Sequence, residues 1–206
     1  MAPRTRALIT AAVLPIALAL SACSESFTDA RDGQSYNVVQ IGSQTWMAEN
    51  LNFALPGAAG DASKNTCPDG SERNCKKMGR LYTWVEAQSV CPEGWRLPSR
   101  EDFETLVKVV GGSTSESVGG SGDALKSTSG WFKKGNGSDA FGFKALPAGN
   151  KRLDGKFDGI GGYAYFWSSS EDSDGASYYL VLDFSSPVAK IEAFGKGEGR
   201  SVRCVK

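Results

Sequence analysis

Apolar residues alternate with polar ones near the start of the chain and gather into aromatic or β-branched runs in its last third. Residues 36–41 and 44–47 predict two strands, and Gly42-Ser43 between them favours a tight hairpin turn. Aromatic and β-branched runs separated by Gly, Ser, Asp and Pro predict four later strands, at 163–167, 178–184, 188–194 and 201–205. The alternation in 178–184 is imperfect, so we expect both faces of that strand to be covered.

Two segments in the middle of the chain predict helices. The first covers residues 80–90 and ends at Cys91-Pro92. The second follows Ser99, an N-cap candidate, and its apolar residues Phe103, Leu106, Val107 and Val110 have the spacing of one helix face. The Gly, Ala, Asp and Ser stretch after Pro56 predicts a loop. The expected fold is therefore α+β, with two helices packed on small antiparallel sheets and long Gly/Ser-rich loops.

The first 22 residues have the pattern of an export signal. Arg4 and Arg6 precede an apolar run at 7–20, which is too short to span a hydrocarbon core of about 30 Å. The run ends in LSAC at 20–23, which resembles the lipobox of bacterial lipoproteins. This resemblance implies cleavage after residue 22 and lipid on Cys23, which would hold the protein on a membrane. We expect residues 23–34 to be a polar tether and residues 35–206 to form one domain.

Charge and composition exclude several kinds of function. The whole chain has 23 basic and 23 acidic residues, and removing residues 1–22 removes two arginines and no acid, which leaves a net charge of −2. No basic field is available for nucleic acid, so no nucleic-acid partner is expected. The chain contains no histidine, which removes every His-based triad and the usual zinc sites.

Four cysteines follow Cys23, an even number that suggests disulfides in an exported protein. Three pairings are possible, and we prefer Cys67–Cys75, which closes a small polar loop, with Cys91–Cys204. The second bond would tie the helical region to the last strand and contribute on the order of 4–5 kcal/mol. A metal site is disfavoured because no two of these cysteines have C-x-x-C spacing.

Aromatic residues could form a platform for a polysaccharide, because rings stack on the apolar faces of sugars. The tyrosines and tryptophans considered are Trp131, Tyr163, Tyr165, Trp167, Tyr178 and Tyr179. We retain Trp131, Tyr163, Tyr165 and Tyr178 as candidate ligand-binding residues and expect Trp46, Trp84, Trp95 and Trp167 in the core. The binding face is expected on the Gly/Ser/Asp-rich loops 113–139 and 150–176, because loops on a rigid scaffold commonly carry recognition.

An acidic segment precedes the strand at 178–184. Glu171, Asp172 and Asp174 supply hard oxygen ligands of the kind that Ca²⁺ prefers. Their spacing matches an EF-hand loop only in part, because the later glutamate is missing. A solvated acidic turn is the favoured interpretation, with a calcium site as the alternative and no other cofactor expected.

Long motifs across residues 35–206 resemble the Fibrobacter succinogenes major paralogous domain. The matching stretches are VQIGSQTWMAENLN at 39–52, GRLYTW at 79–84, CPEGWRLPS at 91–99, LKSTSGW at 125–131, GFKALPAG at 142–149, YFWSS at 165–169 and SVRCV at 201–205. The resemblance implies an exported, often lipid-anchored bacterial protein without an assigned reaction.

A broader resemblance concerns the fold. RLPSREDFE at 96–104 and SVRCV at 201–205 are similar to two segments of the formylglycine-generating fold, a variant of the C-type lectin-like fold. The resemblance implies a bond between a cysteine near the helices and one in the last strand, which supports Cys91–Cys204. The late copper-binding cysteine pair of the enzyme is missing, as are the E-P-N or Q-P-D and W-N-D motifs of calcium-dependent lectins.

These observations favour a non-enzymatic, lipid-anchored extracytoplasmic binding module that recognises a polysaccharide or a protein. A divergent enzyme of the formylglycine-generating superfamily and a purely structural envelope lipoprotein are the alternatives. Ser24 after the lipidated cysteine resembles proteins sorted to the outer membrane, so we expect that membrane, with the domain on its periplasmic or cell-surface face.

Overall fold

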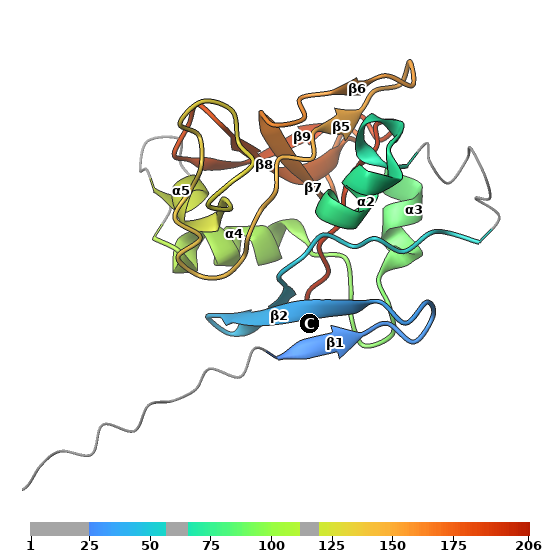
Figure 1. Ribbon diagram of the computed structural model, residues 1–206, viewed down its shortest axis with the longest axis horizontal. Helices are drawn as coiled ribbons and strands as arrows, with labels where there is room; N and C mark the ends of the chain where they lie inside the picture. The colour runs from blue at the N-terminus through green and yellow to red at the C-terminus, as the bar shows by residue number, and fades with distance from the viewer. Residues whose placement is uncertain (1–24, 57–65, 112–119) are drawn as a thin grey trace, which may run out of the picture.

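The computed structural model describes residues 25–56, 66–111 and 120–206 (Figure 1). The predicted signal segment and Cys23 lie outside these residues, as does part of the loop at 113–139. Among the described residues, no helix is both long enough and apolar enough to cross a membrane.

A small antiparallel sheet forms the lower layer in Figure 1, with β1 (Ser26–Thr28), β2 (Ser35–Ile41) and β3 (Gln44–Met47) in that order. The predicted hairpin β2–β3 is confirmed. The prediction that residues 23–34 are only a tether is wrong for β1, which pairs with β2 along its whole length. The Phe27 ring packs 5.4 Å from that of Trp95, so this segment has apolar contacts that its composition did not reveal.

The main sheet has five strands in the order β4-β10-β7-β8-β9. Their bounds are β4 (Leu81–Tyr82), β10 (Arg200–Ser201), β7 (Tyr163–Glu171), β8 (Ser177–Asp183) and β9 (Ala189–Phe194). The expectation of purely antiparallel pairing is wrong for β10, where Ser201 pairs with Phe166 in parallel. No hairpin joins β10 to β7, so their directions are not forced to oppose each other. A separate hairpin contains β5 (Asn150–Lys151) and β6 (Phe157–Asp158).

The prediction of two helices is incomplete, because the described residues contain four α-helices. They are α2 (Glu72–Met78), α3 (Trp84–Val90), α4 (Arg100–Val109) and α5 (Ser121–Leu125), with a 3₁₀ turn, η1, at Pro68–Gly70. Helix α4 begins after Ser99, the predicted N-cap, which forms a full capping box with Asp102. Helix α3 starts at Trp84 rather than residue 80, because Thr83 forms a capping box with Glu86 and β4 pairs with β10.

The core lies on both faces of the main sheet, as the imperfect alternation in β8 predicted. On one face, α4 and α5 pack against Phe166, Leu180 and Leu182, and the buried Trp46 joins this cluster. On the other face, Trp167 and Tyr179 pack against residues of β4, α3 and the segment that follows it. Trp95 is buried here too, whereas Trp84 is half-buried and donates its indole N–H to the Ser168 carbonyl at 2.9 Å.

Both predicted disulfides are present, Cys67–Cys75 within the η1–α2 segment and Cys91–Cys204 across 113 residues. The end of the chain returns to the N-terminal sheet, where Thr45 and Lys206 exchange two backbone hydrogen bonds of 3.0 and 3.1 Å. Figure 1 accordingly shows the C-terminus against β2. Backbone pairing therefore joins the N-terminal sheet to the end of the chain, and the Cys91–Cys204 bond joins that end to the segment after α3.

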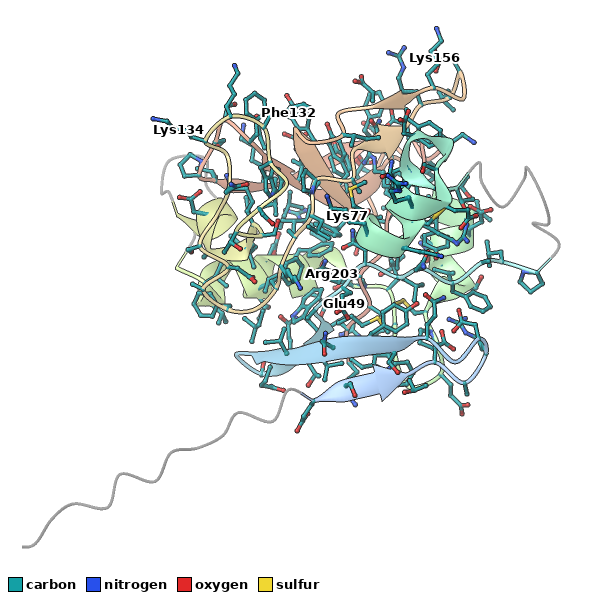
Figure 2. The ribbon with its side chains drawn as sticks, viewed as in Figure 1. Glu49, Lys77, Phe132, Lys134, Lys156 and Arg203 are labelled. Atoms are coloured by element: carbon teal, nitrogen blue, oxygen red, sulfur yellow. A yellow bond between two sulfur atoms is a disulfide. The ribbon has the colours of Figure 1, made fainter. Side chains whose placement is uncertain are left out.

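Arg203 is a buried cation at the centre of the molecule (Figure 2). Its guanidinium donates to the carbonyls of Phe143 and Lys144 and to the Asn50 side chain. It also lies over the Phe143 ring, 4.4 Å from the ring centroid. Burial lowers the pKa of this guanidinium, because the charged form loses its hydration. The carbonyl and amide oxygens partly replace that hydration, so Arg203 joins the end of the chain to the 142–149 segment.

Candidate functional site

Two open hollows meet at Tyr163, near the end of the molecule opposite β1 and β2. The larger has a volume of about 550 Å³ and the smaller about 160 Å³. The larger is lined by Asp69, Asn74, Phe132, Phe157, Asp158, Gly159, Ile160, Gly162, Tyr163 and Phe184. The smaller is lined by Tyr163, Tyr165, Tyr179, Val181, Asp183, Ser186, Val188, Lys190 and Glu192. We call the two hollows together the aromatic groove.

The main sheet positions the tyrosines of the smaller hollow. Tyr163 and Tyr165 are two residues apart on β7, so they project from the same face, and their ring centroids lie 5.6 Å apart in a stacked arrangement. Strand β8 adds Tyr179, whose ring meets that of Tyr165 edge-on at 5.9 Å. Three phenol rings from two neighbouring strands therefore form one aromatic surface.

Arg200 supports this surface from within the protein. Its guanidinium carbon lies 3.5 Å from the Tyr179 ring centroid and 5.5 Å from that of Tyr165, distances typical of cation–π contacts. The side chain is 2% exposed, and its Nη2 donates to Glu198 at 2.9 Å. This contact fixes the orientation of both rings before any ligand arrives.

The hydroxyls of Tyr165 and Tyr179 stay neutral. Burial raises the pKa of Tyr179 to about 12 and also raises that of Tyr165, because the phenolate loses its hydration. The Tyr179 hydroxyl donates to Glu192 at 2.9 Å, which leaves the other carboxylate oxygen of Glu192 for a ligand hydroxyl. The smaller hollow thus combines neutral rings with carboxylate acceptors and the Lys190 cation.

A buried lysine holds the turn that forms the far wall of the smaller hollow. The Lys126 ammonium donates to the carbonyls of Asp183 and Ser186 at 3.2 and 2.9 Å and is paired with Asp123 at 3.3 Å. The Lys126 residue is 2% exposed. The turn between β8 and β9 is therefore held in place by a charge-assisted contact, in addition to its own hydrogen bonds from the Ser185 N–H to Asp183 and from the Val188 N–H to Ser186.

In the larger hollow, Phe132 rests on glycine backbone. A Cβ at Gly161 would lie 2.4 Å from the Phe132 ring, and Gly161 has a φ of +83°, so a side chain at this position would strain the backbone and displace the ring. The Phe132 N–H also donates to the Gly161 carbonyl at 2.7 Å. Phe132 is nevertheless 54% exposed, so much of its ring faces solvent (Figure 2).

The opposite wall comes from the loop closed by Cys67–Cys75. Asp69 has a φ of 55° within η1, a left-handed conformation that aspartate tolerates better than most residues. The Asn74 side chain donates to the Pro68 carbonyl at 3.0 Å. The disulfide therefore holds a carboxylate and an amide beside the aromatic rings of the larger hollow.

The structure brings together only part of the predicted ligand-binding set. Tyr163 and Tyr165 lie in the groove. Tyr178 lies on the opposite face of β8, where Arg100 donates to its hydroxyl at 3.1 Å. The prediction for Trp131 is wrong, because its ring is 5% exposed and its indole N–H donates to Ser127 and to a backbone carbonyl.

Sequence reasoning missed the phenylalanines of the groove, Phe132, Phe157 and Phe184. The available signal was positional, since Phe132 and Phe157 fall within the two loops that were expected to carry the binding face. Phe184 ends a predicted strand and lies outside both of those loops.

The acidic segment before β8 is a hairpin turn. One oxygen of Asp172 accepts the backbone N–H groups of Asp174 and Ala176, and Glu171 is paired with Lys196 at 2.6 Å. These contacts agree with the favoured interpretation of a solvated turn and hold the carboxylates in protein contacts. Within the described part of the chain, the one cluster with metal-ligand geometry is Cys67, Glu72 and Cys75, whose two sulfurs are joined in a disulfide.

These features define a small disulfide-bonded α+β domain with an open aromatic groove on the part of its surface that the structure describes. The model of the Fibrobacter succinogenes major domain matches residues 39–206, so the chain belongs to this family. This confirms the resemblance drawn from the sequence motifs. No curated protein and no solved structure matches the chain.

Proposed function

We propose that this chain is a lipid-anchored, extracytoplasmic binding protein that recognises a polysaccharide in the aromatic groove. The observation that carries the proposal is the meeting of two hollows at Tyr163, each lined by aromatic rings together with carboxylates. Rings stack on the apolar faces of sugars, carboxylates accept hydrogen bonds from hydroxyl groups, and amides both accept and donate them. That combination suits a carbohydrate better than a purely apolar ligand.

The position of the groove supports this role. Strand β1, where the described chain begins, lies at the bottom of Figure 1, whereas Phe132 is labelled at the top of the same view in Figure 2. A lipid on Cys23, just before β1, would leave the groove pointing away from the membrane. The groove would then be open to polymers of the envelope or of the surroundings.

A non-enzymatic role agrees with the side chains available. The chain has no histidine, and the four cysteines after Cys23 are joined in the two disulfides. The groove carries carboxylates, but their neighbours are the rings and backbone donors of a binding surface. The enzyme alternative would instead need a reactive group within the groove.

We further propose that the domain is a variant of the C-type lectin-like fold. The bond Cys91–Cys204 supports this assignment, since it joins the region of the helices to the last strand. The backbone pairing of Thr45 with Lys206 supports it as well, because it closes the domain by bringing its first hairpin to its last residues.

Co-sedimentation of the full chain, purified in detergent, with insoluble polysaccharides tests the proposed function. The panel would contain cellulose, chitin, β-1,3-glucan, starch and a polyuronate gel, and we expect saturable binding to at least one of them. Tyr163→Ala is expected to abolish it, and Tyr178→Ala, on the opposite face, serves as the matched control. Absence of binding across the panel would refute the proposal and direct attention to a protein partner for the same groove.

A further inference from the structure

The aromatic groove is not one pocket but two, and they differ in chemistry. The rings of the larger hollow are mainly phenylalanines, which stack but form no hydrogen bonds through their side chains. The rings of the smaller hollow are tyrosines, with Glu192 bonded to one of them. Tyr163 lines both. We propose that the groove binds an internal stretch of a neutral, linear polysaccharide, with at least one sugar unit on each side of Tyr163; this inference rests on the proposed function.

Shape argues for a chain rather than a single sugar. Neither hollow is enclosed, and Tyr163 lines both of them. A ligand that occupied only one hollow would leave the rings of the other exposed to water. A polymer that crosses Tyr163 covers both sets of rings and can leave the groove at either side.

Each side of the groove is held in place by contacts within the protein, which argues for two independent subsites. On the side of the larger hollow, the N–H of Phe184 donates to the Gly162 carbonyl at 2.9 Å, and Phe132 is tied to Gly161 as described above. On the side of the smaller hollow, Arg200 and Lys126 hold the rings and the turn. Because each side is already ordered, each sugar unit adds its contacts without a further cost of loop ordering.

Charge argues for a neutral polymer. Asp69 and Asp158 line the larger hollow and no cation is among its lining residues. Lys133 and Lys151 lie over two of its rings, 5.5 Å from the Phe184 centroid and 5.9 Å from the Phe157 centroid. The smaller hollow has two carboxylates and one cation, Lys190. A polyuronate would bring its own carboxylates against these groups, and like charges at short distance repel.

Isothermal titration calorimetry with two oligosaccharide ladders tests this inference. The probes are β-1,4-linked glucose oligomers of one to six units and galacturonate oligomers of the same lengths, added to the full chain in detergent. We expect affinity to rise by roughly tenfold or more between one unit and three units, and then to level off. Reduction of the terminal sugar to its alditol should leave the affinity of the hexamer unchanged, because the chain ends lie outside the groove.

Two variants test whether sugar units of the bound polymer occupy both hollows. Phe132→Ala and Tyr165→Ala are each expected to weaken the hexamer by roughly tenfold, with Tyr178→Ala again as the control. Phe132 is 54% exposed, so removal of its ring is not expected to unfold the domain. Thermal unfolding of both variants would check that each remains folded.

The possible failures are distinguishable. A single glucose that binds as tightly as the hexamer would overturn the chain model, and a uronate ladder that binds at least as well as the neutral one would overturn the charge argument. If both variants bound the hexamer with the affinity of the wild type, the sugar would bind outside the two hollows. Binding of the polyuronate gel from the insoluble panel, but of none of its neutral polymers, would refute this inference and keep the proposed function. No binding of any polysaccharide would refute the proposed function itself.

Discussion

The two disulfides close loops of very different length, and this difference predicts unequal contributions to stability. Cys91–Cys204 joins residues 113 apart in sequence, and Cys67–Cys75 joins residues 8 apart. If the main effect is loss of loop-closure entropy in the unfolded chain, these lengths correspond to about 5 and about 2.5 kcal/mol. For a domain of this size, about 1 kcal/mol shifts the melting temperature by roughly 2–4 °C.

The perturbation is the paired substitution Cys91→Ala with Cys204→Ala, and the matched control is Cys67→Ala with Cys75→Ala. Alanine is preferable to serine because Cys204 is fully buried, and a hydroxyl there would need a hydrogen-bond partner. Urea unfolding of the full chain measures the free energy of unfolding for each variant. We expect the first variant to lose about 5 kcal/mol and the second about half of that.

The slope of unfolding free energy against urea provides a second readout. Removing the long crosslink lets the unfolded chain expand, so the slope should increase more in the first variant than in the second. An equal loss in both variants, or a larger one for the short loop, would refute the entropy argument. It would mean that local contacts in the native state, such as the η1–α2 wall of the groove, determine the effect.

Three further predictions concern single side chains. The hydrogen bond from Arg31 lowers the pKa of Asp29, so its contribution is complete well above pH 3.8 and is lost as the pH falls below that value. Asp29→Asn should therefore cost about 1–3 kcal/mol at pH 7 and make stability less dependent on pH between about pH 2 and 5, measured by urea unfolding across that range. Arg203→Met should cost about 3 kcal/mol or more, because two backbone carbonyls lose their buried donor, and an unchanged midpoint of unfolding would contradict this. Gly161→Ala should displace the Phe132 ring and lower polysaccharide affinity by roughly tenfold, which titration against wild type would check.

Much of the fold was predictable because its signals are local. The β2–β3 hairpin is encoded by two apolar runs around Gly42-Ser43, and α4 is encoded by the capping box at Ser99 together with one apolar face. Helix α2 carried no such signal, since Glu72–Met78 is mostly polar and lacks a regular apolar face. Its position beside the Cys67–Cys75 bond and its packing on the rest of the domain decide its conformation.

The groove was predictable only in outline. Sequence reasoning placed it on the loops around 113–139 and 150–176, and residues of both loops line the larger hollow. It could not show that, of the neighbouring residues Trp131 and Phe132, the first is buried and the second is exposed. The Trp131 indole finds hydrogen-bond partners in the core, while Phe132 lies on the backbone of Gly161, about thirty residues away in sequence.

The sequence by itself determined the hydrophobic periods, the helix caps, the even set of cysteines and the absence of histidine, because each depends on residues close together in the chain or on composition alone. Only the tertiary structure decided the parallel pairing of β10 with β7, the face on which Tyr163, Tyr165 and Tyr179 meet, and the burial of Arg200 beneath them. These depend on which segments lie side by side. That choice is made by packing the whole chain around a shared core, where distant residues compete for the same space.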